Sequence, residues 1–237
     1  MVADAEPRVL KHQIVRKNLD ALLDEMSPGD PFPSERDLAG KYDVARETLR
    51  QAIRELLVAG RIERRGRATV VAEPKVVLPL AIGSYTEAAR EKGMTATRIL
   101  VGWTLDAADD ELATLLHIET GSPIVQLERV FTTDGVRVGL ERTRIPGYRV
   151  PGLVETFDHR ASLYTELDRR GIRFGRVIDS IETVLPDARE ASLLAVDART
   201  PMFLLNRVSY DADGVPIEQR RSLYRGDRMT FTAVMEA

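Results

Sequence analysis

The sequence contains no cysteine, which excludes disulfides and metal sites built on thiolates. Its three histidines, His12, His117 and His159, lie far apart, so no pair has the spacing of a metal-ligand motif. No apolar run approaches the roughly 20 residues that span a bilayer, and the N-terminus lacks the apolar core of a signal peptide. We therefore expect a cytoplasmic protein without a metal, a cofactor or a membrane segment.

Charge, by contrast, is present and unevenly distributed. The 237 residues carry a net charge of −3, yet residues 44–67 hold seven arginines and three glutamates. This segment has a net charge of +4, so the rest of the chain carries −7. A local basic patch on an acidic chain is typical of a focused contact with nucleic acid. A solvated helix face would give the same surplus, so charge alone leaves both interpretations open.

Three helices and a hairpin are predicted in the first part of the chain, over residues 9–26, 34–41, 45–59 and 61–71. Three prolines and a glycine in residues 27–33 end the first helix. Ser34 has the position of an N-cap, with Asp37 three residues on, and Gly60 follows the third helix where a left-handed residue is favoured. The order predicts a winged helix-turn-helix DNA-binding domain in residues 1–72.

The third predicted helix has an apolar stripe along one face. A ridge of exposed arginines, Arg46, Arg50 and Arg54, runs along another face. Arginine pairs bidentately with guanine in the major groove, and the N-terminal residues of a recognition helix face the bases. We therefore expect Arg46 and Arg50 to read bases, with Glu47 and Thr48 beside them.

Other residues of this domain are placed to meet the DNA backbone. Ser34 and Arg36 begin the second helix, where free amides and the helix dipole favour a phosphate. The hairpin tip, Arg65, Gly66 and Arg67, is expected to enter an adjacent minor groove.

The rest of the chain, residues 80–237, is predicted to be an α+β domain with a mainly antiparallel sheet, joined by a linker over residues 73–79. Helices are expected over residues 84–92, 109–116, 163–170 and 187–195. Strands are expected over residues 98–105, 124–132, 137–145, 177–185, 203–210, 216–224 and 229–234. Each half contains a short helix and a hairpin with an Asp-Gly turn, which suggests an internal repeat.

The first domain resembles the GntR family of bacterial regulators over residues 8–72. The similarity lies in residues 33–39 and 44–52 and in Leu56, Gly60, Ile62 and Gly66. The resemblance implies that DNA is contacted by Arg36, Arg46, Arg50 and Gly66. Two residues depart from the family pattern: Ala45 replaces a serine, and Ala68 replaces a second glycine of the wing.

The second domain resembles the ligand-binding (UTRA) domain of the HutC subfamily, which has a chorismate-lyase-like fold. The similarity includes residues 84–87, 127–129, 140–142, 162–164, 216–218 and 224–227. Members of the subfamily sense sugars, sugar derivatives and organic acids, so the resemblance implies a small-molecule effector. It places the effector site at Ser84, Thr86, Arg129, Glu141, Ser162, Tyr164, Glu218 and Tyr224.

The physical chemistry of these residues fits a polar ligand. Arg129, Glu141 and Glu218 fall on strands that should be half-buried, where an unpaired charge costs several kcal/mol. A ligand or a salt bridge between Arg129 and Glu141 would satisfy them, and both interpretations remain open. Ser162 begins a helix and suits an anionic group. Phe131 stands where many members carry a second arginine, which favours a less charged or partly apolar ligand.

Together these features predict a homodimeric repressor that a small molecule releases from a palindromic operator. An activator of the same architecture is the first alternative. A lyase-like enzyme is a second, but the sequence offers no catalytic residue set: it lacks a nucleophile elbow and a phosphate-cradling glycine loop. A DNA-binding protein without a ligand is a third, and it would leave the buried polar residues unexplained.

Overall fold

The computed structural model describes residues 11–66, 68–80, 85, 89 and 93–234. The chain forms two compact units, residues 1–75 and residues 76–237.

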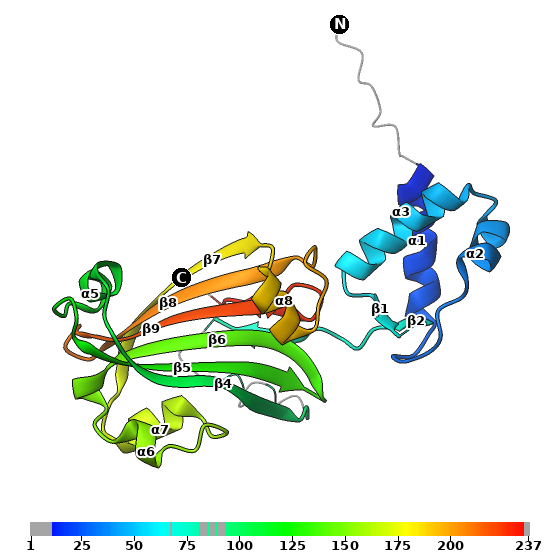
Figure 1. Ribbon diagram of the computed structural model, residues 1–237. Helices are drawn as coiled ribbons and strands as arrows, with labels where there is room; N and C mark the ends of the chain where they lie inside the picture. The colour runs from blue at the N-terminus through cyan, green and yellow to red at the C-terminus, as the bar shows by residue number, and fades with distance from the viewer. Residues whose placement is uncertain (1–10, 67, 81–84, 86–88, 90–92, 235–237) are drawn as a thin grey trace, which may run out of the picture. The chain divides into compact units, whose positions relative to one another are not determined.

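The first unit is a winged helix-turn-helix, as predicted (Figure 1). Its elements are α1 (Lys11–Asp24), α2 (Glu35–Tyr42), α3 (Arg46–Val58), β1 (Ile62–Arg65) and β2 (Ala68–Val71). The strands β1 and β2 pair in antiparallel fashion and form the wing. The core consists of apolar side chains at helical spacing, including Leu19, Leu38, Leu49 and Leu56.

The helix-turn-helix has one capped helix and one uncapped helix. The Ser34 side chain accepts a hydrogen bond from the backbone N–H of Asp37, as expected for an N-cap. Asp43, in the left-handed conformation with φ of 49°, ends α2. Ala45 occupies the N-cap of α3 and has no side-chain oxygen to accept a bond. Such caps contribute about 1 kcal/mol, so the departure at Ala45 lowers the intrinsic stability of α3.

A six-stranded antiparallel sheet forms the centre of the second unit, in the order β4-β5-β6-β9-β8-β7. Its strands are β4 (Ala96–Ala107), β5 (Pro123–Thr133), β6 (Val136–Pro146), β7 (Phe174–Val184), β8 (Met202–Asp211) and β9 (Pro216–Arg225). The α+β class and the mainly antiparallel sheet were predicted correctly.

The strand order supports the suspected internal repeat. Strand, helix, strand, strand occurs as β4, α5 (Asp110–Leu116), β5, β6 and again as β7, α8 (Ala188–Leu194), β8, β9. Both helices have an aspartate N-cap, Asp109 and Asp187, and both end at a left-handed residue. The halves meet where β6 pairs with β9 in the middle of the sheet.

The two faces of the sheet are covered by different elements. One face, here called the front face, carries Val125 and Leu127 and packs against α6 (Leu153–Thr156) and α7 (Leu163–Arg169). The other, the back face, carries Val130, Leu140 and Leu223 and packs against Leu194 of α8. Figure 1 shows α6 and α7 on the side of the sheet away from α8. A short 3-10 helix, η1 (Gly147–Arg149), follows β6.

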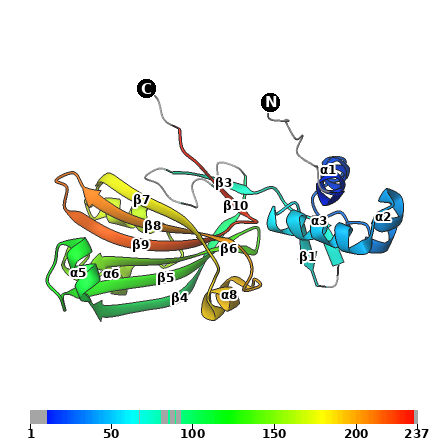
Figure 2. The same ribbon diagram turned by 90° about the horizontal axis from the view of Figure 1, so that it is seen from above.

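The expected linker was too long. Its last four residues form strand β3 (Val76–Pro79), which pairs in parallel with β10 (Met229–Thr232) (Figure 2). The prediction failed because this pairing joins segments about 150 residues apart and has no local sequence signal. Most of the helix predicted over residues 84–92 lies outside the described residues.

Candidate functional site

The arginine ridge of α3 is exposed, as predicted. Arg46 begins the helix with an exposed side chain, and Arg50 donates a 2.8 Å hydrogen bond from Nε to Glu35. Arg54 donates to Glu47 at 3.1 Å. The hydrogen bond with Glu35 raises the pKa of Arg50, so the guanidinium stays charged. Exposed ion pairs are worth about 1 kcal/mol or less, so such a pair can be exchanged for a contact with DNA.

The residues expected at phosphates and in the minor groove are also at the surface where the structure describes them. The Ser34 hydroxyl donates to Asp37 at 2.7 Å, and the exposed Arg36 lies 3.6 Å from the same carboxylate. Gly66 at the wing tip has φ of +63°, a conformation that favours glycine. Arg65 pairs with Glu63 at 2.8 Å. The predicted contact Arg67 lies outside the described residues.

A buried ionic cluster occupies the front face of the sheet in the second unit. The Arg129 Nη2 atom donates to Glu141 Oε1 at 3.1 Å, which is the predicted salt bridge. The second carboxylate oxygen of Glu141 lies 3.5 Å from Nη1 of Arg220 on β9. Burial alone would raise the pKa of Glu141, but the two arginines more than offset it and hold the pKa below its usual value.

Glu218 is the second buried carboxylate of this face, and its side chain is fully inaccessible. It accepts hydrogen bonds from the Tyr164 hydroxyl at 2.6 Å and from the Ser209 hydroxyl at 2.9 Å. Burial raises the pKa of Tyr164, so the phenol stays protonated and keeps donating. The Arg220 guanidinium lies over the Tyr164 ring, 5.3 Å from its centroid, and so links the two carboxylates.

Sequence reasoning missed three charged members of the cluster. Arg220 lies two residues from Glu218 on β9, and strand alternation puts both on one face. Arg207 on β8 forms a bidentate pair with Asp179, with both N–O distances at 2.6 Å. Arg207 follows Asp187, the N-cap of α8, at the same spacing as Arg129 follows the N-cap of α5, so the repeat could have identified it. The pairing with Asp179 has no such signal.

Several buried polar atoms of this face have no hydrogen-bond partner among the described residues. They include Arg129 Nε, Thr143 Oγ1, Glu218 Oε2 and Arg220 Nε. Leaving a buried donor or acceptor unsatisfied costs about 1–3 kcal/mol. Donors and acceptors are both represented, so a polar molecule with groups of both kinds would satisfy them.

The front face holds more charged groups than the sequence analysis placed there. Arg207 pairs with Asp179, and Arg129 and Arg220 both lie near Glu141. Arg98 of β4 adds a further positive charge near Glu141, because its guanidinium lies over the Phe131 ring, 5.6 Å from the centroid. Phe131 itself is buried against the Tyr85 ring, at 5.0 Å between centroids.

Of the remaining predicted effector residues, the structure describes Ser162 and Tyr224. Ser162 caps α7 by accepting a bond from Thr165 N–H. Tyr224 is buried on β9 next to the cluster, and burial raises its pKa. Ser84 and Thr86 lie outside the described residues.

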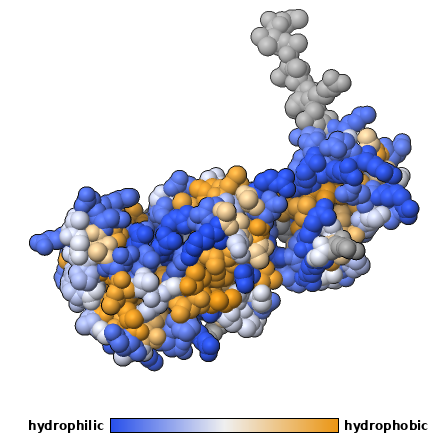
Figure 3. Space-filling view, viewed as in Figure 1, coloured by the Kyte–Doolittle hydropathy of each residue, from blue (hydrophilic) through white to orange (hydrophobic). Residues whose placement is uncertain are grey.

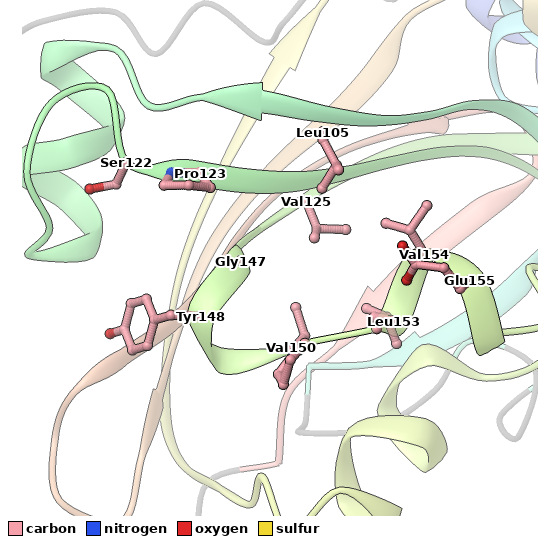
Figure 4. A pocket seen from close by; sticks show the side chains of 12 residues that line it. Leu105, Ser122, Pro123, Val125, Gly147, Tyr148, Val150, Leu153, Val154 and Glu155 are labelled. Carbon is pink, nitrogen blue, oxygen red and sulfur yellow. The ribbon is translucent and has the colours of Figure 1, made fainter.

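A separate hollow of about 420 Å³ lies at the end of the sheet where β5 begins and β6 ends (Figure 4). It is lined mainly by apolar side chains, including Leu105, Val125, Val150 and Leu153. Glu155 is the one charged residue of the lining, and no residue of the ionic cluster takes part. The hollow therefore lacks the paired donors and acceptors that distinguish the cluster.

No helix in the described part of the chain is both long and apolar enough to cross a membrane. Among the same residues, no group of three or more histidine, aspartate or glutamate side chains is arranged to hold a metal ion.

Comparison with protein-family models gives two matches. Residues 10–71 match the model described as bacterial regulatory proteins, gntR family, and residues 91–230 match the UTRA domain. The HTH-type transcriptional repressor PhnF of Mycolicibacterium smegmatis is 66% identical over all of this chain and 97% of that protein. The HTH-type transcriptional repressor NagR of Bacillus subtilis is 31% identical over 90% of this chain and 88% of that protein.

Solved structures agree with these matches. The crystal structure of PhnF from Mycobacterium smegmatis superposes with a TM-score of 0.71 at 66% identity, and covers 94% of this chain and 99% of its own. The crystal structure of the PhnF effector domain gives a TM-score of 0.67 at 67% identity over 68% of this chain and all of its own. These similar proteins are regulators of transcription and not enzymes.

Proposed function

The chain belongs to the gntR family of bacterial regulatory proteins with a UTRA domain, and we propose that it is a cytoplasmic, homodimeric repressor that leaves a palindromic operator when a small molecule binds. DNA binding and response to a ligand follow from its two domains. Repression is supported by the two relatives named above, both of which are repressors. Two-fold symmetry of a dimer would require two half-sites in opposite orientation.

The DNA contact is proposed to centre on α3. Arg46 and Arg50 would meet guanine edges, with Glu47 and Thr48 at neighbouring bases. Ser34 and Arg36 would meet phosphates, and the wing tip, Arg65, Gly66 and Arg67, would enter an adjacent minor groove. The exposed Arg50–Glu35 pair would have to open first, because a guanidinium bound to a carboxylate cannot also make a bidentate contact with guanine.

The effector site is proposed to be the ionic cluster of the front face. It is supported by the buried polar atoms of Arg129, Thr143, Glu218 and Arg220 that have no hydrogen-bond partner within the described ranges of the chain. A sugar, a sugar derivative or an organic acid offers donors and acceptors to match them. Ser84, Thr86, Ser162, Tyr164 and Tyr224 would complete the site, and Glu141 would hold the two arginines in place.

The test is fluorescence anisotropy with labelled DNA from immediately upstream of the gene, at low and physiological salt. Tight binding that weakens steeply with salt is expected, and Arg46→Ala and Arg50→Ala should each weaken it at least tenfold. Lys17→Ala is the matched control, since it removes an exposed positive charge from α1. Equal losses in all three variants, or binding no tighter than to random DNA, would contradict the proposed recognition helix.

A further inference from the structure

Strand β7 is a free edge of the central sheet. It pairs with β8 along one side, from Phe174 to Val184, and no strand in the described part of the chain lies along its other side. In an edge strand, the backbone N–H and C=O groups of the outer side can pair with another extended chain. Proteins usually protect such edges with bulges, charges or covering elements.

Both edge strands, β4 and β7, contain a bulge, but at different places. The pairing of β4 is interrupted in its middle by a bulge between Leu100 and Gly102. The irregularity of β7 lies at its beginning, between Phe174 and Arg176, so the strand is regular from Arg176 to Val184. β4 also exposes apolar side chains, and Figure 3 shows apolar residues gathered over the strands at that edge. The exposure of apolar side chains is therefore similar at the two edges and does not distinguish them. The long stretch of β7 without a bulge makes β7 the better edge for pairing with another strand.

The side chains of β7 are self-complementary. Ile178 is 49% exposed and Ile181 is 39% exposed, so both faces of the strand present apolar surface to solvent. Arg176 and Glu182 are exposed near the two ends of the regular segment. Alternation places both on the same face, because the two positions are six residues apart along the strand.

We propose that a second copy of this chain adds to β7 in antiparallel orientation, about a two-fold axis at Asp179, and so joins the two sheets into one. In this register Arg176 lies opposite the partner's Glu182, and by symmetry the same ion pair forms twice. Val177 lies opposite the partner's Ile181, again twice. The inference rests on the proposed homodimer and names the surface that forms it.

The residue on the axis is compatible with this register. Two copies of Asp179 would face each other, and like charges directly opposite are unfavourable. Each carboxylate, however, is already held by Arg207 through two hydrogen bonds of 2.6 Å. The two neutral pairs that meet at the axis therefore carry no net repulsion.

The proposed register of the two β7 strands can be tested by reversing one charge of the Arg176–Glu182 pair and then reversing both. Sedimentation equilibrium of the full chain over a range of concentrations gives the dimer dissociation constant. Arg176→Glu and Glu182→Arg each bring like charges together twice, and each should raise this constant about tenfold or more. The double variant restores both pairs with the charges exchanged, so its constant should return to within about threefold of the original.

Two controls separate this inference from the homodimer itself. Arg173→Glu reverses an exposed charge just outside β7, and Ile99→Glu places a charge on the other edge. Neither should change the dissociation constant by more than about threefold. A dimer that is unaffected by the β7 variants, or that Ile99→Glu disrupts instead, would overturn the β7 interface while leaving the homodimer in place. A chain that is monomeric at micromolar concentration would overturn both.

Discussion

Replacing Glu141 by glutamine would remove the charge that two buried arginines share. Glu141 is 5% exposed, and its carboxylate lies 3.1 Å from Arg129 and 3.5 Å from Arg220. Glutamine keeps the shape and one acceptor oxygen but leaves both cations without their common anion. Breaking a buried ion pair in this way costs about 3–5 kcal/mol, or roughly two to four powers of ten in the unfolding equilibrium.

Urea unfolding followed by tryptophan fluorescence measures this loss in the second unit alone, because the single tryptophan, Trp103, packs there against Phe157. The matched control is Glu119→Gln, an exposed glutamate after α5, which should change the free energy of unfolding by less than about 0.5 kcal/mol. A second variant, Arg129→Met with Glu141→Leu, replaces the pair by apolar groups and should recover part of the loss. If Glu141→Gln lost less than about 1 kcal/mol, the cluster would be accessible to water and the argument for an unsatisfied buried site would fail.

Three further outcomes follow from the contacts of single residues. Glu35→Gln frees Arg50 from its exposed pair and should tighten operator binding up to about fivefold at low salt in anisotropy titrations; unchanged or weaker binding would contradict competition by Glu35. The Glu128 carboxylate is buried, which alone would raise its pKa, but hydrogen bonds from two arginines hold the pKa below its usual value. Its contribution to stability is therefore complete above about pH 4.5 and is lost as the pH falls through the lowered pKa, so urea midpoints measured from pH 7 to pH 3 should fall less steeply in Glu128→Gln than in the original chain. Gly139→Ala would place a Cβ atom 2.8 Å from the Tyr224 ring and should destabilise the second unit by about 1–3 kcal/mol in the same urea assay; an unchanged midpoint would mean that the ring moves freely.

The first domain was predictable because its signals are local. Proline and glycine punctuation, the Ser34 cap and the helical spacing of apolar residues act within a few residues of one another, and each predicted helix formed. The ridge on α3 followed from the same periodicity. The partners of these arginines could not be predicted from the sequence. The Arg50–Glu35 pair, for example, depends on the angle between two helices.

In the second domain, predictability ended where pairing became nonlocal. Arg129 does lie opposite Glu141 on the hairpin of β5 and β6, but the Asp-Gly turn alone does not give this register. Counted from the Thr133–Val136 pair, Arg129 would face Leu140, and a bulge between Phe131 and Thr132 moves the pairing by one residue. Arg220 was missed although alternation from Glu218 puts it on the same face, because the expected site was taken from the family resemblance alone. The parallel pairing of β3 with β10 and the partnership of Asp179 with Arg207 depend on strands brought together over long separations, where the sequence holds no register signal.

The ionic cluster on the front face and the contacts that hold α8 on the back face are formed by neighbouring residues of the same strands. A change in one is therefore expected to affect the other. Arg129 faces the cluster, while the preceding Glu128 faces the back and accepts bonds of 2.9 and 2.5 Å from Arg189 of α8. Likewise Arg220 faces the cluster, and the following Arg221 donates to Glu190 of α8 at 2.7 Å. Successive side chains of a strand point to opposite faces, so a strand that shifts or twists to satisfy a polar ligand in front must move its back-face charges as well. Glu190 also caps the start of α8 by accepting from the backbone N–H of Asp187, so any such movement is transmitted to the first turn of that helix. If the effector binds the front face as proposed, these neighbouring residues connect its site to a helix on the other side of the sheet.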